Sequence, residues 1–296
     1  MSIAFIGAGK VSKTFGLYLK NHGVAVAGYY SRTYQSAVDA AALIGTVPYR
    51  SLTELLSAAD IILITTPDDV ISAVVAQIQA EITENAELAA SLPDKSFAHM
   101  SGVHSSELLK PLHAMGATTF SLHPLLAFTE PVRSAEALEG AYFAIDGSGA
   151  HYQQIIDQLE QIIDKLIEIA PAQKALYHAA SAVIANYQIA IIDLGLTMLT
   201  ELGYTREQAL QLAEPLVRQN VDNLFALDCG QALSGPIARG DAGTVAKHVA
   251  AITATNQEWL DLYRRLGSLT IELASRAQRI NAEQVTKLKE VLNNDE

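Results

Sequence analysis

The sequence contains little cysteine and little positive charge. One cysteine, Cys229, is present among 296 residues, so an intramolecular disulfide and a cysteine-rich metal site are both excluded. Lys and Arg number 20 against 32 Asp and Glu, which gives a formal net charge of −12. Proteins that bind nucleic acid or anionic membranes need a basic face. We therefore expect a cytoplasmic protein that binds a small-molecule substrate and has neither a nucleic acid nor a membrane as partner.

Long uninterrupted hydrophobic segments are also missing. The apolar run at the start of the sequence follows no positive segment and precedes no small-residue cleavage pattern, which predicts a strand and not a signal peptide. The most apolar stretch, residues 182–199, is interrupted by Asn186, Gln188, Asp193 and Gly195, which a membrane span tolerates badly. We expect a buried helix there, serving either the core of one chain or the contact with a partner.

The composition and the hydrophobic pattern indicate two globular domains. Half of the residues are hydrophobic and 18% are charged, and the length suits two domains. In residues 1–170, short β-rich runs alternate with helical patterns, which predicts a doubly wound, mostly parallel sheet of the Rossmann type. After Pro171 the strand pattern ends, so residues 171–296 are predicted to form a helical substrate-binding and dimerisation domain. Strands are expected at residues 3–6, 24–30, 61–65, 96–100, 118–122, 141–145 and 166–169.

A glycine turn follows the first predicted strand and opens a helix. Gly7 allows the tight turn, and Gly9 lets backbone N–H groups approach a pyrophosphate at the positive end of the helix dipole. Ser12 stands where a third glycine is usual, and its small size still permits close packing of helix and strand. The turn therefore predicts a dinucleotide site whose pyrophosphate is held by Gly7, Ala8, Gly9, Lys10, Val11 and Ser12.

The end of the second strand selects the cofactor. An Asp or Glu at this place would bind the ribose 2′-OH of NAD and repel a 2′-phosphate, but no acid is present. Ser31, Arg32 and Thr33 instead offer two hydroxyls and a guanidinium to a phosphate. These residues predict NADP as the cofactor. Along the crevice, the residues expected to flank its ribose and nicotinamide are Thr65, Thr66, Pro67, Val70, His99 and Ser101.

Six segments together resemble the Rossmann-like NADP oxidoreductase family whose C-terminal half is a domain of unknown function. The resemblance spans nearly the whole chain, and wider relatives include pyrroline-5-carboxylate reductase, deazaflavin-dependent NADP reductases, and the 6-phosphogluconate and β-hydroxyacid dehydrogenases. It implies a Rossmann domain joined to a 6-phosphogluconate-dehydrogenase-like helical domain that often dimerises, so a homodimer is expected. The substrate is not implied. The segments are Gly7-x-Gly9-x-x-Ser12, Ser31-Arg32-Thr33, His99-Met100-Ser101-Gly102, Ser121-Leu122-His123-Pro124, Tyr177-His178-Ala179-Ala180 and Gly235-Pro236-Ile237-Ala238-Arg239-Gly240-Asp241.

One departure from these relatives concerns the chemistry. The β-hydroxyacid dehydrogenases carry a catalytic lysine one helical turn before an asparagine, but Ala182 stands one turn before Asn186 here. Lys174 lies three turns before Asn186, and we do not transfer the role to it. The simple β-hydroxyacid dehydrogenase mechanism is therefore not expected, although Asn186 is still a candidate to orient a substrate oxygen.

Four histidines are the candidate acid–base groups, because imidazole titrates near neutral pH. His99 and His123 are expected at the ends of strands, His178 on the helix that enters the second domain, and His248 after the loop of Arg239 and Asp241. We rank His178 first as the proton donor or acceptor and His123 second, and we expect Ser101 to hydrogen-bond the nicotinamide or a substrate carbonyl. The spacing of His99, His104, His113 and His123 does not suit a metal site, so no metal is predicted. The Gly235–Asp241 loop offers Arg239 and Asp241, which would either hold a substrate carboxylate or pair with each other.

These observations predict an NADP-dependent dehydrogenase or reductase. It would transfer a hydride between NADP(H) and a small oxo acid, hydroxy acid or imine bound between the two domains. The sequence leaves two alternatives open. One is a non-catalytic NADP-sensing protein, and the other is hydride exchange between NADP and a deazaflavin.

Overall fold

The computed structural model describes residues 1–293 and forms two compact units. The first unit is Met1–Tyr187, and the second begins at Gln188. The turn Pro171–Gln173 and the helix α9 (Lys174–Ala182) that follow the sheet belong to the first unit. The side chain of Lys174 is buried there, so the start of this helix is fixed to the sheet domain.

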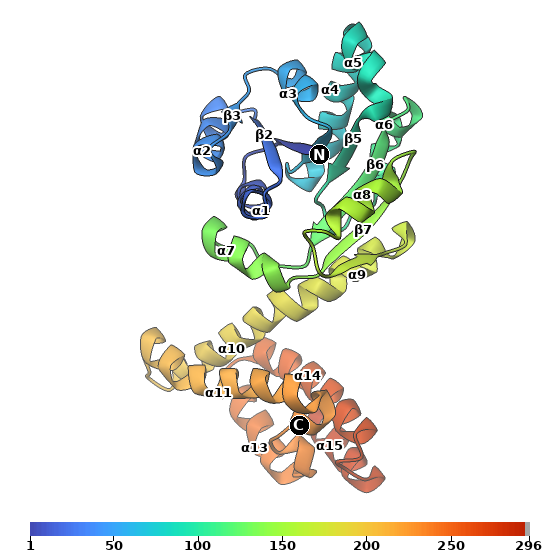
Figure 1. Cartoon of the computed structure of the whole chain (residues 1–296). Helices are drawn as coiled ribbons and strands as arrows, with labels where there is room; N and C mark the ends of the chain where they lie inside the picture. The colour runs from blue at the N-terminus through green and yellow to red at the C-terminus, as the bar shows by residue number, and fades with distance from the viewer. Residues whose placement is uncertain (294–296) are drawn as a thin grey trace. The chain divides into compact units, whose positions relative to one another are not determined.

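The first unit is built on one eight-stranded sheet with the order β3-β2-β1-β4-β5-β6-β7-β8 (Figure 1). Neighbouring strands run parallel except for β6 and β7, which are antiparallel. This mostly parallel arrangement with helices on both faces confirms the predicted Rossmann-type α/β fold. The strands are β1 (Ser2–Ile6), β2 (Ala25–Tyr30), β3 (Val47–Pro48), β4 (Ile61–Ile64), β5 (Ser96–His99), β6 (Thr118–Pro124), β7 (Phe143–Ser148) and β8 (Leu166–Glu168).

Two features of the sheet were not predicted from the sequence. The strand β3 has only two residues, Val47 and Pro48, which is too short for an alternating pattern. The direction of β7 was also not predicted. An antiparallel strand starts at the edge where its neighbour ends, so the connection from β6 to β7 does not cross the sheet. Its helix α7 (Pro131–Ala137) packs against α1 instead of completing a parallel crossover.

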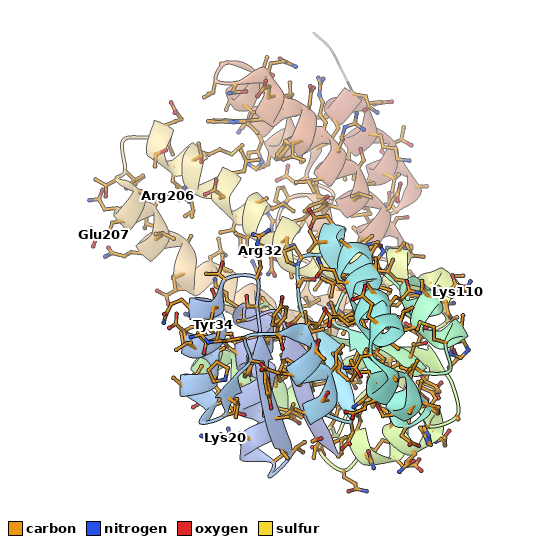
Figure 2. The ribbon with its side chains drawn as sticks, turned by 90° about the horizontal axis from the view of Figure 1, so that it is seen from above. Lys20, Arg32, Tyr34, Lys110, Arg206 and Glu207 are labelled. Atoms are coloured by element: carbon orange, nitrogen blue, oxygen red, sulfur yellow. The ribbon has the colours of Figure 1, made fainter. Side chains whose placement is uncertain are left out.

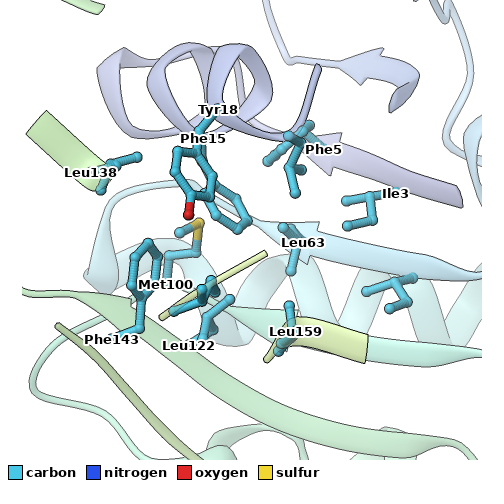
Figure 3. Packing of buried hydrophobic residues seen from close by; sticks show 14 of the residues in the cluster. Ile3, Phe5, Phe15, Tyr18, Leu63, Met100, Leu122, Leu138, Phe143 and Leu159 are labelled. Atoms are coloured by element: carbon cyan, nitrogen blue, oxygen red, sulfur yellow. The ribbon is translucent and has the colours of Figure 1, made fainter. Parts of the chain in front are cut away.

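Alternating residues of the strands face two hydrophobic cores, one on each side of the sheet. Ile3 and Phe5 of β1 face one core, and Ala4 and Ile6 face the other. In the first core the ring of Phe5 stacks on that of Tyr29, and the ring of Phe15 stacks on that of Tyr18. Figure 3 shows this core, which Phe15 reaches from helix α1. Residues 3–6 of β1 are apolar on both faces, as a central parallel strand requires.

The helices of the first unit fill the intervals between the strands, largely where the apolar periodicity predicts them. They cover the sheet on both faces (Figure 1). Its α-helices are α1 (Lys10–Asn21), α2 (Tyr34–Ile44), α3 (Leu52–Ala58), α4 (Ile71–Glu84), α5 (Ala86–Ser91), α6 (Lys110–Ala114), α7 (Pro131–Ala137), α8 (Tyr152–Leu159) and α9 (Lys174–Ala182). Short 3-10 turns lie at Asp68–Val70, Leu92–Asp94, Ser106–Leu109, Leu138–Gly140 and Pro171–Gln173.

The second unit is helical in the residues that the structure describes, which confirms the predicted helical C-terminal domain. Its core gathers Val245, Ile271, Leu288 and neighbouring side chains from three helices. A capping box stabilises the start of α11, where the Gln208 N–H donates to Thr205 Oγ1 at 3.2 Å. The helices are α10 (Gln188–Glu201), α11 (Arg206–Leu227), α12 (Cys229–Ala232), the 3-10 turn Ile237–Arg239, α13 (Ala242–Thr253), α14 (Gln257–Arg276) and α15 (Ala282–Asn293).

The expectation of a buried helix at residues 182–199 is wrong for the single chain. Residues 171–201 form a helical stretch long and apolar enough, by length and composition, to span a membrane, and 6% of its most apolar window is buried. Ile184 is 73% exposed and Ile189 is 68% exposed. Apolar periodicity shows that a helix has a face to bury, but it does not say what buries that face.

Candidate functional site

The glycine turn after β1 has the geometry that a phosphate-binding turn needs. Gly7 adopts φ +111°, and a Cβ there would lie 2.8 Å from the carbonyl oxygen of Thr65. Only glycine fits this position without strain. Gly9 behaves differently, because a Cβ there would meet nothing within 4 Å. The space above Gly9 is therefore open to an approaching ligand.

The start of helix α1 leaves backbone N–H groups free beside this open space. Gly9 is the N-cap residue, and no side chain caps the helix. Unpaired N–H groups and the helix dipole favour an anion at such an end. Ser12 is fully buried and its Oγ donates to the carbonyl of Gly9 at 3.1 Å, so its side chain packs the turn and does not face the ligand space. Lys10 is exposed and Val11 is partly exposed.

A cavity of about 870 Å³ lies at the carboxyl ends of β1, β2 and β4. It brings together most of the residues predicted to bind the cofactor. They are Gly7, Ala8, Gly9, Ser31, Arg32, Thr33, Thr65, Thr66, Pro67 and Val70. Ile6, Tyr30, Ser36, Asp69, Ala73, Val74 and Gln77 complete its lining. The predicted residues Lys10, Val11, Ser12, His99 and Ser101 do not line it.

The side of the cavity at the end of β2 is polar and positively charged. Arg32 and Thr33 are exposed, and Ser36 on helix α2 lines the same wall. Figure 2 labels Arg32 and Tyr34, which follow one another closely after β2. The Arg50 guanidinium stacks over the ring of Tyr34 at 3.9 Å, which adds a second cation beside this segment. These groups fit a phosphate ester better than a free ribose hydroxyl.

The strand order arranges the predicted residues in a row along one edge of the sheet. Arg32 follows β2, the glycine turn with Gly7 follows β1, Thr65 follows β4, Ser101 follows β5, and His123 lies near the end of β6. Neighbouring strands are about 4.8 Å apart, so His123 stands about 10 Å along the edge from Thr65. A dinucleotide extended from Arg32 across the glycine turn would point its far end toward Ser101 and His123.

Two predicted histidines come together over Gly102. A Cβ on Gly102 would lie 2.4 Å from Nδ1 of His178 and 2.7 Å from Nε2 of His123. The two rings are nearly perpendicular, with their centroids 5.7 Å apart. The absence of a side chain at Gly102 is therefore what lets both ring nitrogens approach the same point. Nδ1 of His178 is buried there without a hydrogen-bond partner.

The environment of His123 keeps its ring neutral. Burial lowers the pKa of His123 to about 4, and the positive charge of Lys174 and the ring of His178 act in the same direction. The other ring nitrogen, Nδ1, lies 3.1 Å from the hydroxyl of Tyr177. Burial raises the pKa of Tyr177, so the phenol keeps its proton at neutral pH. Tyr177 belongs to the family-like segment around His178, but no role was predicted for it.

His99 is fully buried, and each of its ring nitrogens makes a hydrogen bond to the backbone. Its Nε2 lies 2.9 Å from the carbonyl oxygen of Ser105, and its Nδ1 accepts from the backbone N–H of Ser101 at 3.3 Å. Burial lowers the pKa of His99 to about 4. The hydroxyl of Ser101 accepts from the backbone N–H of His104 at 3.2 Å. His99 therefore shapes the loop that carries Ser101 and Gly102, and its ring is not directed at the cavity.

A buried polar network lies beneath this loop and was not predicted. Lys174 Nζ donates to Ser121 Oγ at 2.9 Å and lies 3.7 Å from Asp146 Oδ2. Ser121 also donates to Asp146, whose other oxygen accepts from the backbone N–H of Ser106 at 2.7 Å. Burial lowers the pKa of Lys174. The signal in the sequence was Asp146 inside the apolar run of β7, since a lone acid there needs a buried partner.

Two other candidates are not part of this cluster. Asn186 lies in a π-helical segment, Val183–Tyr187, and is exposed. Asp241 caps helix α13 by accepting from the Thr244 N–H at 2.9 Å, and its hydrogen bonds to Thr244 lower the pKa of its carboxyl. Within residues 1–293, no group of three or more His, Cys, Asp or Glu side chains is placed to hold a metal ion.

Two family descriptions match the chain. A Rossmann-like domain matches residues 1–124, and the domain of unknown function DUF2520 matches residues 141–270. The chain therefore joins a region that matches a Rossmann-like domain to a region that matches this C-terminal domain, as the resemblance predicted. No curated protein matches the chain.

Solved structures share the fold over nearly the whole chain. Protein TM1727 from Thermotoga maritima is 23% identical with a TM-score of 0.70, covering 93% of this chain and 99% of its own. The candidate NADP oxidoreductase BF3122 from Bacteroides fragilis is 18% identical with a TM-score of 0.71, covering 92% and 98%. A reductive aminase from Aspergillus terreus, in complex with NADPH and ethyl-5-oxohexanoate, is 14% identical with a TM-score of 0.58, covering 98% and 92%.

Proposed function

We propose that the protein is an NADP-dependent oxidoreductase. The observation that carries this proposal is the cavity at the carboxyl ends of β1, β2 and β4, with an open glycine turn at its centre and Arg32 at one end. The fold is shared with proteins whose structures contain NADPH or NADP, among them pyrroline carboxylate reductase from Plasmodium falciparum. The Rossmann-like domain supports the same cofactor class.

The residues of the cavity fit NADP group by group. The open face of Gly9 and the uncapped start of α1 would hold the pyrophosphate. Ser31, Arg32 and Thr33 would hold the 2′-phosphate through charge-assisted hydrogen bonds. Thr66 lines the same cavity and its buried Oγ1 has no hydrogen-bond partner, so it is free to bind a ribose or carboxamide group.

The reaction would take place where Ser101, His123 and His178 follow the cofactor along the sheet edge. Bound NADPH supplies a hydride to an electrophilic carbon. The oxygen or nitrogen attached to that carbon then needs a proton, and His178 is placed to provide it because its unpartnered Nδ1 faces Gly102. In the oxidative direction His178 would accept the same proton. Lys174 is buried and paired with Asp146, so the network positions the site and does not reach the substrate.

We further propose that a second copy of the chain covers the exposed apolar side chains of α10 and α11. Phe225 is 84% exposed and Leu216 is 62% exposed, and a groove of about 600 Å³ between the two helices is lined by Ile192, Leu210 and Val217 among others. A monomer rarely leaves such a surface uncovered. The homodimer implied by the family resemblance would bury it. The acids Glu207 and Glu214 in the same groove do not suit a lipid surface.

The oxidoreductase proposal is tested by following the nicotinamide absorbance of NADPH mixed with the protein. Cyclohexanone and ethyl levulinate are suitable first probes, each alone and with allyl amine. Structures of a reductive aminase that shares this fold contain these molecules. We expect NADPH oxidation with at least one probe and its loss in His178→Ala. If NADPH binds tightly but no carbonyl or imine causes its oxidation, a cofactor-sensing protein is the better description.

A further inference from the structure

Tyr177 and His123 share a hydrogen bond. Which of the two side chains donates it determines the chemistry of the site. His123 lies near the end of β6, and Tyr177 lies on helix α9, which follows the sheet. The Tyr177 hydroxyl and His123 Nδ1 are 3.1 Å apart, and the two rings meet edge to face with centroids 5.7 Å apart. Both residues belong to the first unit.

The proton in this contact belongs to the phenol. A phenol O–H is a much stronger acid than the N–H of a neutral imidazole, and an imidazole nitrogen is the better acceptor. Burial keeps His123 neutral, since it lowers the pKa of the ring to about 4, with Lys174 and His178 acting in the same direction. The hydroxyl of Tyr177 therefore donates to Nδ1, and the single ring proton of His123 is left on Nε2.

Nε2 is the nitrogen that faces the reaction site. It lies 2.7 Å from the position a Cβ of Gly102 would take, next to the unpartnered Nδ1 of His178. With its proton on Nε2, His123 offers a hydrogen-bond donor at this point and no acceptor. A neutral imidazole N–H can polarise a carbonyl without being protonated itself.

We propose that Tyr177 is a positioning residue that holds His123 as the Nε2–H tautomer, and that this N–H receives the oxygen of a carbonyl substrate or of the corresponding alcohol. The inference rests on the proposed function and narrows its substrate class. A carbonyl oxygen accepts this hydrogen bond, and the alkoxide that forms during reduction accepts it more strongly. The nitrogen of a protonated imine carries no acceptor, so its N–H could not form a hydrogen bond with the Nε2–H of His123.

The atoms balance for a carbonyl substrate. The hydride forms the new C–H bond, and the C=O π pair moves to the oxygen, which lies against Nε2–H of His123. That oxygen then takes a proton from His178, which regains it from water. The products are an alcohol and the oxidised nicotinamide, and the His123–Tyr177 pair is unchanged at the end.

The tautomer can be measured directly on protein labelled with ¹⁵N-histidine, in spectra that separate protonated from bare ring nitrogens. His123→Gln identifies the resonances. We expect a bare Nδ1 and a protonated Nε2 in the wild type, and a mixture of both tautomers in Tyr177→Phe. Tyr187→Phe, which changes a 61% exposed ring at the end of the π-helical segment Val183–Tyr187, is the matched control and should leave the spectrum unchanged. A wild-type ring protonated at Nδ1, or no response to Tyr177→Phe, overturns the proposal.

The substrate class is tested on the same labelled protein with NADP⁺ present. Cyclohexanone is the acceptor probe, and cyclohexylamine, which is an ammonium ion at neutral pH, is the donor probe. We expect the Nε2–H resonance of His123 to shift with the ketone and to stay in place with the amine. A shift with the amine alone, or with neither probe, overturns the carbonyl assignment. Failure of the proposed function is a separate result, because the tautomer is read without any nucleotide.

Discussion

Lys174 Nζ lies 3.7 Å from Asp146 Oδ2, and both side chains are almost completely buried, at 1% and 2% exposure. Together with Ser121, this pair joins helix α9 to strands β6 and β7 beneath the loop of Ser101 and Gly102. Burying two charges is costly, and removing one of them is costlier because the other is left unpaired.

Lys174→Met should therefore lower the free energy of unfolding by about 3–5 kcal/mol. The double variant Lys174→Met/Asp146→Asn should recover part of this loss, because no uncompensated charge remains in the interior. Lys110→Met, which changes a 70% exposed lysine, is the control and should stay within about 0.5 kcal/mol of the wild type. Urea unfolding measures all three. Equal losses for Lys174→Met and the double variant would mean that the pair is not coupled.

The two glycines of the turn should respond differently to alanine. Gly7→Ala places a Cβ 2.8 Å from the Thr65 carbonyl oxygen at φ +111°, so both stability and NADPH binding should fall. Gly9→Ala meets no protein atom within 4 Å, so its melting temperature should stay close to that of the wild type while its NADPH affinity falls at least tenfold. Thermal unfolding and calorimetric titration of both variants separate the two effects. Unchanged NADPH affinity in Gly9→Ala would place the phosphates elsewhere.

Gly102→Ala should disturb the histidine pair. The added Cβ would come within 2.7 Å of a nitrogen on each ring, so the rings must move apart, at a cost of about 1–3 kcal/mol. The His123 and His178 resonances should shift, and NADPH oxidation should fall. Gly140→Ala, where a Cβ meets nothing within 4 Å, is the matched control. Identical histidine spectra in Gly102→Ala and the wild type would contradict the packing described above.

Stability should depend on pH through His99 and His123. Above pH 6.5 these rings are neutral in both the folded and unfolded chain. Between pH 6.5 and about 4 the unfolded rings bind protons that the folded rings do not, so stability falls as the pH drops through this window. The loss is on the order of 3 kcal/mol for the fully buried His99. Urea unfolding at pH 7.5 and 5 should show a smaller difference for His99→Asn than for the wild type. Equal differences would contradict a buried neutral ring.

The apolar surface of the second unit should mediate self-association. Phe225→Glu changes an 84% exposed ring on α11 and should shift the protein toward monomer in sedimentation velocity experiments. Val132→Glu, at a 51% exposed position of α7 in the first unit, is the control and should leave the sedimentation unchanged. A monomeric wild type at micromolar concentration would contradict the proposed second copy.

The sequence predicted the parts of the fold and site that depend on local pattern. Local pattern predicts that a strand ends at Ile6, that a turn follows at Gly7, and that no acid stands near Arg32. The structure brings Ile6, Gly7 and Arg32 into the lining of one cavity. The pairing of Lys174 with Asp146 and the contact between Tyr177 and His123 join segments far apart in the chain, and no local pattern specifies them. The exposure of Ile184 was missed for another reason, since burial by a partner leaves the same periodicity as burial in a core.

The most direct test of the account is calorimetric titration of the protein with NADPH and with NADH, repeated on Arg32→Ala and on the control Arg133→Ala, which changes an exposed arginine of α7 away from the cavity. We predict that the wild type and Arg133→Ala bind NADPH at least about tenfold more tightly than NADH, a difference of about 1.4 kcal/mol. Arg32→Ala should lose that preference while keeping its affinity for NADH. Equal affinities for both nucleotides in the wild type, or binding of neither, would contradict the account.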